Sequence, residues 1–206
     1  PGMVYISQPT EFGTLYSLNE LEQISQVCRE YKIPLYIDGA RLAYALACPE
    51  NDVALPDIAR LCDAFYIGGT QCGTLFGAAV VIPQHNRIPY LFTIIKQHGA
   101  LLAKGFTAGI QFDTLFTAGL YFEIGRNAID TANRIRAALQ EKGYQLVFNS
   151  PTNQIFVLLT KEQVKKLSEK VVMGFWENPD KDHTIMRIAT SWATKKDEVD
   201  ALIKVF

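Results

Sequence analysis

Short apolar segments alternate with amphipathic helical patterns through the first 82 residues of this 206-residue chain. Strands are predicted at residues 3–7, 35–37, 64–68 and 74–82, the last read as a long buried strand. Parallel neighbouring strands need a crossover segment between them, and helices are the usual crossovers. The alternation therefore predicts a layered α/β fold with a largely parallel sheet.

Helical patterns fill the intervals between the first three predicted strands, at residues 18–31, 40–47 and 56–62. The first of these helices opens with Ser17 and Glu20, which have the spacing of a capping box. Pro34 follows that helix and Pro49 follows the second, which is typical of helix ends.

The pattern changes after Pro89. A long, mostly helical stretch runs from about residue 90 to residue 140, and its glycines weaken the helical pattern locally. Strands are then predicted at 144–148, 154–159, 171–176 and 184–189, with helices opening at Thr160 and Thr194. This predicts a small α+β unit. We place the domain boundary near residue 100, so that 1–100 form one unit and 101–206 the bridging helices and small unit.

The overall composition excludes several classes of protein. The chain is 49% hydrophobic with a formal charge of −1, which suits one or two globular units. Nucleic-acid binding is disfavoured because there is no basic surplus. A membrane partner is disfavoured as well, because no apolar run reaches the eighteen residues that a spanning helix needs.

Cysteine and histidine spacing argues against disulfides and metals. The four cysteines never form a C-x-x-C pair, which favours a reducing compartment, the cytoplasm. The three histidines lie far apart without partners at ligand spacing, so no metal site is expected. The cysteines are Cys28, Cys48, Cys62 and Cys72, and the histidines are His85, His98 and His183.

Asp38 is the first candidate for chemistry. In "PLYIDGARLAYA" it follows an apolar strand and precedes Gly39, at the end of the sheet where ligands bind in α/β folds. Two interpretations stay open. Asp38 caps the next helix with Arg41 as its ion-pair partner, or Asp38 faces a cationic ligand atom while Arg41 holds an anionic one.

The stretch "YIGGTQCGTLFG", residues 66–77, contains a glycine turn that presents Gln71. It has G-x-x-x-x-G from Gly68 to Gly73, but Thr74 stands where a phosphate-binding P-loop needs lysine, and a strand is predicted to follow. A nucleotide site is therefore excluded. Arg187, in "TIMRIATSWAT", is either a solvated strand charge or a residue that grips a carboxylate bidentately.

Four of these segments, taken in order, resemble a known family. "YIDGARL", "YIGGTQCGTLFG", "TNQIF" and "MRIATSWAT" are similar to the threonine aldolase and aromatic amino acid β-eliminating lyase family. Its members are pyridoxal-phosphate (PLP) enzymes of the aspartate aminotransferase fold. The resemblance implies the C-terminal part of a fold type I large domain, residues 1–100, plus a small α+β C-terminal domain. Because the family has a region ahead of this part, we expect that the chain begins after it.

The resemblance also implies roles for single residues. Asp38 matches the aspartate that pairs with the pyridinium nitrogen of PLP, which keeps the ring an electron sink. Arg41 matches an arginine near the cofactor and the substrate carboxylate, and Arg187 matches the arginine that grips this carboxylate. Thr70 is expected beside the cofactor. Tyr36 departs from the many relatives that have histidine at its position.

Gln71 occupies the position of the family's Schiff-base lysine. A glutamine amide is neither a nucleophile nor a useful base, because its nitrogen lone pair is delocalised. Lys96 and Lys104 lie outside the matching turn, and Lys104 is expected on the long helix. No covalent link to PLP is therefore expected, and we expect the chain to be inactive in this form.

Several functions stay open. The first is descent from an amino-acid lyase that performs retro-aldol cleavage or β-elimination on an amino-acid substrate. The second is a non-enzymatic remnant that forms homo-oligomers like its relatives, through apolar segments such as "FTAGIQFDTLFTAGLYF". A third is PLP binding without a covalent link, in a longer form of the protein. The amino-acid sequence is equally consistent with an engineered lysine-to-glutamine variant.

Overall fold

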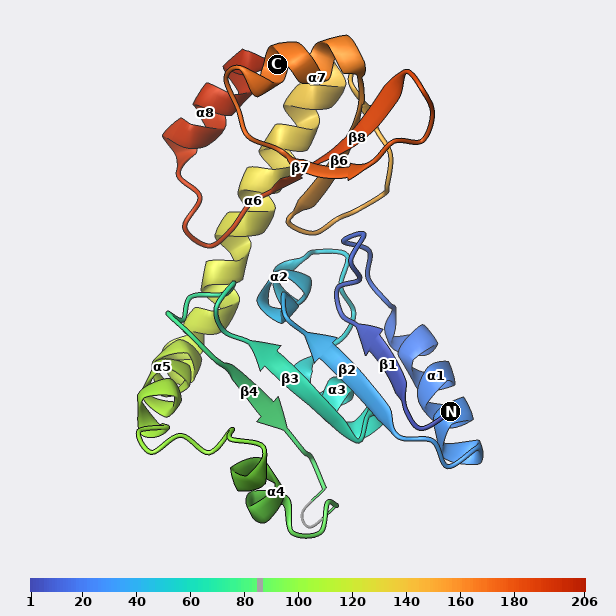
Figure 1. Cartoon of the computed structure of the whole chain (residues 1–206), viewed down its shortest axis with the longest axis vertical. Coiled ribbons are helices and arrows are strands. Elements are labelled where there is room, and N and C mark those ends of the chain that lie inside the picture. Colours follow the sequence, from blue (N-terminus) through green and yellow to red (C-terminus); the bar gives the residue numbers. More distant parts are fainter. Residues whose placement is uncertain (85–86) are drawn as a thin grey trace.

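Two units, joined by a long helix, make up the computed structural model, which describes residues 1–84 and 87–206. The joining helix is α6, Leu120–Glu141, and it runs from the first sheet to the C-terminal unit (Figure 1). His85, one of the three histidines considered above, lies outside the described residues. Within the described ranges, no helix is long and apolar enough to cross a membrane.

The first unit contains a four-stranded sheet in the order β1-β2-β3-β4. The first three strands are parallel and β4 is antiparallel to β3, so the expectation of a largely parallel sheet is correct. Its strands are β1 Val4–Ser7, β2 Leu35–Gly39, β3 Ala64–Gly68 and β4 Ala78–Val81. Its connecting helices are α1 Leu18–Glu30, α2 Leu42–Ala47 and α3 Leu55–Leu61.

The strand predicted at 74–82 is much shorter in the structure. Only Ala78–Val81 form β4, and Val80 is 64% exposed, so the prediction of a long buried strand is wrong. Two glycines explain the difference, because Gly73 and Gly77 have φ angles of +106° and +90° that strand backbone does not adopt. As the last strand of its sheet, β4 also has a neighbour on one side only.

The capping box at the start of α1 is confirmed. The Ser17 hydroxyl accepts a hydrogen bond from the backbone N–H of Glu20, and the Glu20 carboxylate accepts one from the backbone N–H of Ser17. The helix buries Leu21, Ser25 and Cys28. It therefore begins at the position that the sequence indicates and turns an apolar face to the sheet.

The two faces of the first sheet differ. Leu35 and Ile37 are buried with the helices that lie behind the sheet in Figure 1. Tyr36, on the opposite face, stacks on Tyr5 with ring centroids 5.4 Å apart and lies 6.3 Å from the ring of Tyr66. Figure 1 shows no helix over this second face. It is thus an open aromatic surface.

The long helical stretch after residue 90 is divided into pieces. It contains α4 Leu91–Gln97, α5 Phe106–Phe116, a short 3-10 turn at Thr117–Gly119, and α6. The break before α6 comes from positive φ angles at Ala118 and Gly119. Lys104 lies exposed in a turn ahead of α5, so its predicted place on a helix is wrong.

The C-terminal unit has an antiparallel sheet in the order β5-β6-β8-β7. The capping box of Thr160 and Gln163 opens α7 as predicted. The strands are β5 Gln145–Leu146, β6 Gln154–Thr160, β7 Gly174–Glu177 and β8 His183–Ala189. The helices are α7 Lys161–Ser168 and α8 Lys196–Val205.

The two units have separate hydrophobic clusters that change over within α6. Ala128 and Ile129 belong to the first cluster, whereas Ala132 and Ile135 belong to the second. One helix therefore contributes its opposite ends to two cores. The domain boundary near residue 100 stays a prediction.

Candidate active site

The glycine turn after β3 is shaped by a close backbone approach. A Cβ atom on Gly68 would lie 2.0 Å from the carbonyl oxygen of Ala40, so only glycine fits there. The turn is closed by hydrogen bonds from the N–H groups of Cys72 and Thr74 to the carbonyl oxygen of Gly69, at 2.7 and 3.0 Å. It leaves the side chain of Gln71 exposed.

A cleft of about 360 Å³ lies between the two units. It contains four of the five residues predicted from the sequence, and Asp38 is not in its lining. The predicted residues are Arg41, Thr70, Gln71 and Arg187. The other lining residues are Tyr44, Asn153, Gln154, Ala189, Thr190, Ser191 and Trp192. The cleft thus joins the loops after β2 and β3 to the segments around β6 and β8.

The buried phenol of Tyr44 connects three walls of this cleft. Its Oη donates a hydrogen bond to the carbonyl oxygen of Gln71 and accepts one from the N–H of Trp192 at 3.3 Å. Burial raises the pKa of Tyr44 well above its usual value, so the phenol remains a donor. No sequence pattern indicates this role, because a tyrosine in "ARLAYALA" is typical of an ordinary core residue.

Both arginines of the cleft bind one carboxylate of the protein itself. Arg41 contacts Glu11 through Nη1–Oε2 at 3.1 Å and Nη2–Oε1 at 3.4 Å. Arg187 Nη1 lies 3.2 Å from Oε1 of the same carboxylate. Arg41 is therefore the partner of Glu11. One interpretation of the sequence paired Arg41 with Asp38, and that interpretation is wrong. Glu11, in the turn-rich "PTEFG", was missed as a site residue.

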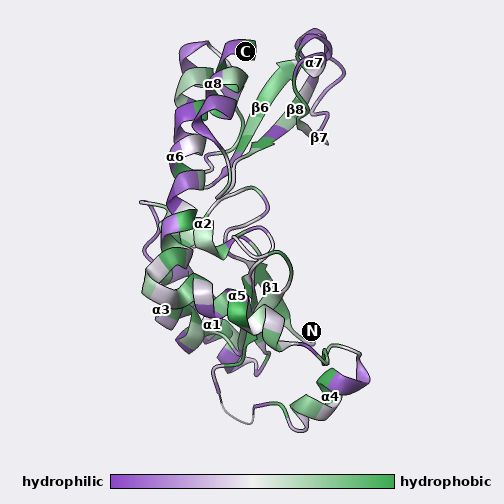
Figure 2. Cartoon of the chain, turned by 90° about the vertical axis from the view of Figure 1, so that its left-hand side faces the viewer, coloured by the Kyte–Doolittle hydropathy of each residue, from purple (hydrophilic) through white to green (hydrophobic). Residues whose placement is uncertain are grey.

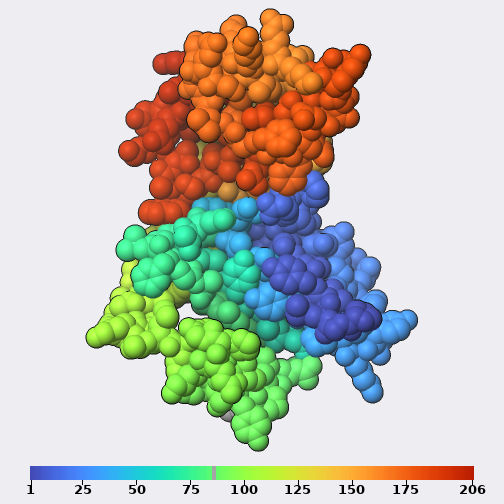
Figure 3. Space-filling view, viewed as in Figure 1, coloured from blue at the N-terminus to red at the C-terminus, as the bar shows by residue number. Residues whose placement is uncertain are grey.

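The loop that carries Glu11 is fastened to the C-terminal unit. Gln154 Nε2 donates to the carbonyl oxygen of Glu11 at 3.0 Å, and its Oε1 accepts from Arg187 Nη1 at 3.3 Å. The Phe12 ring packs 5.5 Å from Trp176. Figure 3 shows this dark-blue segment against the orange C-terminal unit. The fastening holds the Glu11 carboxylate at the cleft.

Asp38 lies at the end of β2 on the open aromatic face. Its carboxylate accepts a hydrogen bond from the Oη of Tyr5 and another from the backbone N–H of Ala40 at 2.8 Å. The bond to Asp38 raises the pKa of Tyr5 to about 12. The helix that follows has Arg41 as its N-cap, without a side-chain cap hydrogen bond. Asp38 is therefore not a helix cap.

Asn153 places an unpaired polar atom at the cleft. The side chain is 3% exposed, and its Nδ2 donates to the carbonyl oxygen of Thr190 at 2.7 Å. Its Oδ1 has no hydrogen-bond partner in the described part of the chain. A buried unpaired acceptor is unfavourable by roughly 1–3 kcal/mol, and a ligand or an ordered water that donates a hydrogen bond to it would relieve this cost.

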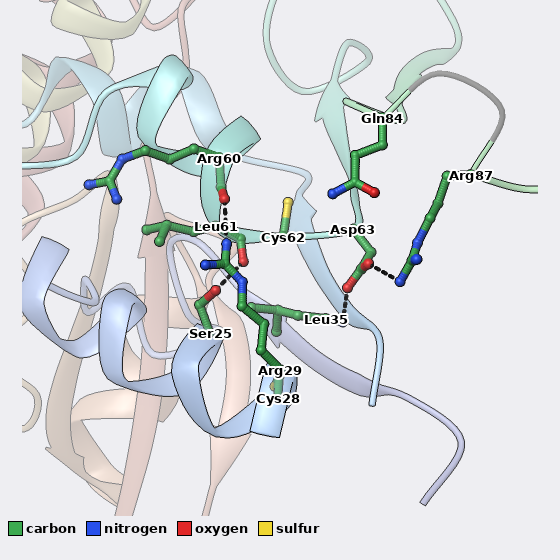
Figure 4. A pocket seen from close by; sticks show the side chains of 10 residues that line it. All are labelled: Ser25, Cys28, Arg29, Leu35, Arg60, Leu61, Cys62, Asp63, Gln84 and Arg87. Atoms are coloured by element: carbon green, nitrogen blue, oxygen red, sulfur yellow. Dashed lines mark hydrogen bonds and ion pairs between the residues drawn. The ribbon is translucent and has the colours of Figure 1, made fainter. Parts of the chain in front are cut away.

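A second cleft, of about 260 Å³, lies at the opposite end of the parallel strands (Figure 4). Asp63, just before β3, accepts from the backbone N–H of Leu35 at 2.9 Å and pairs with Arg87 at 2.7 Å. Because ligands of α/β folds bind beyond the carboxyl ends of the strands, we assign the candidate site to the first cleft. Among residues 1–84 and 87–206, no cluster of three potential ligands could hold a metal ion.

The fold matches that of enzymes built on the PLP-dependent fold type I. A solved structure of threonine aldolase from Leishmania major has a TM-score of 0.95 and 43% sequence identity, and it covers 100% of this chain. Serine palmitoyltransferase from Sphingomonas wittichii has a TM-score of 0.67 at 15% identity, which is a likeness of fold alone. The expected fold class, part of a fold type I large domain with a small α+β unit, is confirmed.

The chain belongs to the β-eliminating lyase family, whose model matches residues 1–171. The low specificity L-threonine aldolase of Pseudomonas aeruginosa is 29% identical over 173 residues, which are 81% of this chain. The family resemblance seen in the sequence is therefore correct. The chain spans about half the length of that relative, 49%, and 60% of the Leishmania major chain.

Proposed function

We propose that this chain carries the amino-acid-binding cleft of a threonine aldolase-type PLP lyase and that Gln71 prevents the covalent anchoring of the cofactor. The main support is that one cleft contains Gln71 together with two arginines that already share a carboxylate. Paired guanidiniums are well suited to bind the carboxylate of an amino acid. We assign that role to Arg41 and Arg187.

The residues present fit non-covalent contacts to PLP. Asp38 offers a carboxylate at the end of β2, three residues before the cleft residue Arg41, where it would pair with the pyridinium nitrogen, and Thr70 offers a hydroxyl in the turn. When bound, PLP supplies an electron sink for the cleavage of a bond at the substrate α-carbon. The chain's own contribution is to hold and orient the amino acid. The unpaired Oδ1 of Asn153 is consistent with a bound ligand nearby.

The covalent anchor does not fit. Position 71 carries an amide, and the two lysines considered above are both exposed and absent from the lining of the cleft. An amide cannot attack the aldehyde carbon of PLP. We therefore propose that the chain in this form is inactive by the family's route, whether Gln71 arose naturally or by engineering.

Borohydride trapping tests this proposal. The chain is incubated with PLP, reduced with borohydride, digested and mapped by mass spectrometry. We expect no reduced pyridoxyl adduct at a lysine of the unaltered chain beyond surface background. We expect Gln71→Lys to gain an adduct at position 71, because the new amine lies beside the cofactor-binding residues.

Gln26→Lys is the matched control, since Gln26 is an exposed glutamine on α1, away from the cleft. A stoichiometric adduct on Lys96 or Lys104 of the unaltered chain would contradict the inactivity. Equal labelling of Gln71→Lys and Gln26→Lys would remove position 71 as the anchoring site.

A non-enzymatic, oligomeric role is a second candidate, and an exposed apolar surface favours it. Side chains of the segment that contains α4 and α5 are largely exposed, and Figure 2 shows hydrophobic green ribbon on both helices. They include Tyr90, Phe92, Leu102, Phe106 and Ile110. Apolar patches of this kind mark association surfaces. We propose that the chain forms homo-oligomers through them.

Light scattering of the purified chain tests this association. Phe106→Ser with Ile110→Ser should lower the average mass, whereas Val172→Ser, at a 98% exposed position in the C-terminal unit, should not. A monodisperse monomer at high concentration would count against the oligomer.

The four cysteines are buried free thiols, which supports the proposed cytoplasmic location.

A further inference from the structure

We infer that Glu11 determines the charge specificity of the cleft, so that the two arginines accept a ligand with a single carboxylate in preference to a dicarboxylate. The inference rests on the proposed amino-acid-binding function and names its substrate class, amino acids with one carboxylate. Glu11 takes no part in breaking or forming a bond of the ligand. It is a specificity-determining residue that sets the charge that the ligand meets.

The formal charges of the cleft support this role. In the described lining of the cleft, Arg41 and Arg187 are the charged side chains, and Glu11 contacts both of them. Two guanidiniums and one carboxylate leave a net charge of one positive. One incoming carboxylate balances that charge, whereas a second carboxylate would meet Glu11 as a like charge.

The arginine geometry leaves room for one more carboxylate. Arg41 donates to the Glu11 carboxylate from both of its Nη atoms, so this pair of donors is already occupied. Arg187 uses Nη1 for both Glu11 and Gln154, and its Nη2 and Nε have no acceptor within the described residues. Its guanidinium also lies over the Trp176 ring, 5.6 Å from the ring centroid, in a cation–π contact. Arg187 can therefore receive a ligand carboxylate while Glu11 stays in place.

The loop that carries Glu11 is fastened to the C-terminal unit at this residue and at the two residues after it. The carbonyl oxygen of Glu11 accepts from Gln154, and the neighbouring Phe12 ring packs 4.8 Å from the ring of Phe148. The next residue, Gly13, accepts from the hydroxyl of Thr152 at 2.8 Å. The backbone that carries the Glu11 carboxylate is thus fixed beside the cleft, and the carboxylate itself is held by the two arginines.

The test uses acetate and malonate as probes and needs neither PLP nor turnover. The indole N–H signals of the two tryptophans report binding by NMR, because Trp192 lines the cleft and Trp176 lies against Arg187. In the unaltered chain we expect malonate to bind no more tightly than acetate. In Glu11→Gln we expect the affinity for malonate to rise by about tenfold more than that for acetate.

Glu22→Gln is the matched control, because Glu22 is a similarly exposed glutamate paired with Arg60 at 2.7 Å, and neither residue lines this cleft. It should leave both affinities unchanged. Glu11→Asp keeps the charge and should keep the acetate-to-malonate ratio of the unaltered chain. Circular dichroism confirms that each variant is folded.

The outcomes separate this inference from the proposed function. If both probes bind and Glu11→Gln leaves their ratio unchanged, the inference is wrong and the carboxylate cleft stands. If Glu11→Asp shifts the ratio as much as Glu11→Gln, loop geometry and not charge is responsible, and the inference is wrong. If neither probe binds any variant, both the inference and the proposed function fail.

Discussion

The phenol of Tyr44 donates a hydrogen bond to the backbone carbonyl oxygen of Gln71, so the position of residue 71 is set by a buried core side chain. The side chain at position 71 plays no part in that contact. The turn that presents it can therefore keep its shape whether the residue carries an amide or an amine. This is why a single substitution at position 71 is a meaningful test of function.

Removing the Tyr44 hydroxyl should destabilise the fold. Tyr44→Phe leaves the carbonyl oxygen of Gln71 without this donor and the N–H of Trp192 without its acceptor. We expect a loss of about 1–3 kcal/mol in the free energy of unfolding, measured by urea denaturation. Tyr31→Phe, at a 71% exposed position, is the control and should change it little. Equal effects of the two substitutions would contradict the bridging role.

The close approach at Gly68 makes a strong steric prediction. The Cβ atom of Gly68→Ala would lie 2.0 Å from the carbonyl oxygen of Ala40, where backbone cannot yield easily. We expect destabilisation by at least about 2 kcal/mol, as in overpacked cores. Gly109→Ala, within α5 and without neighbours within 4 Å, should be neutral or stabilising by up to about 1 kcal/mol. Thermal unfolding compares the two variants.

The hydrogen bond between Tyr5 and Asp38 predicts a pH dependence. The pKa of Tyr5 is raised from 10.0 to about 12 in the folded chain. Folding therefore favours the protonated phenol, so this contribution is fully present below pH 10 and is lost as the pH rises toward 12. Tyr5→Phe should reduce the decline of the unfolding free energy in this window.

Ultraviolet titration of tyrosinate provides an independent check on this pair. Asp38→Asn removes the charge that holds the Tyr5 proton and that adds to the effect of burial in raising the pKa of Tyr66 and Tyr36, so all three tyrosines should titrate at lower pH than in the unaltered chain. The same Asp38→Asn substitution made in Tyr5→Phe should produce a smaller shift. If the two backgrounds respond equally, the raised pKa of Tyr5 has another cause.

Arg187 should be essential for carboxylate binding. It is 32% exposed at the side chain and keeps donors free for a ligand. We expect Arg187→Gln to weaken acetate binding by about tenfold or more, because a charge-assisted hydrogen bond is lost. Arg134→Gln, at the exposed pair with Asp200, is the control and should bind acetate normally. Retained binding in Arg187→Gln would refute the assigned role.

Local patterns determined much of this protein. The capping boxes of Ser17 with Glu20 and of Thr160 with Gln163 open helices where the sequence predicts them, because both hydrogen bonds of each box join residues three apart. Apolar runs predicted the three parallel strands, because the burial of a strand is recorded in consecutive residues of the chain. The family motifs placed Arg41, Gln71 and Arg187, and the structure brings these three residues to one cleft.

Only the tertiary structure decided the rest. The strand β4 is short because Gly73 and Gly77 have positive φ angles and because β4 lies at the edge of its sheet. The hydrophobic periodicity of the sequence indicates neither property. The contact between Glu11 and Arg187 joins residues 176 apart in the chain, so no local spacing could reveal it. Periodicity reports which residues share a face of one element. Partners across a cleft are fixed by the packing of whole units, and that packing gave Glu11 its place between two arginines.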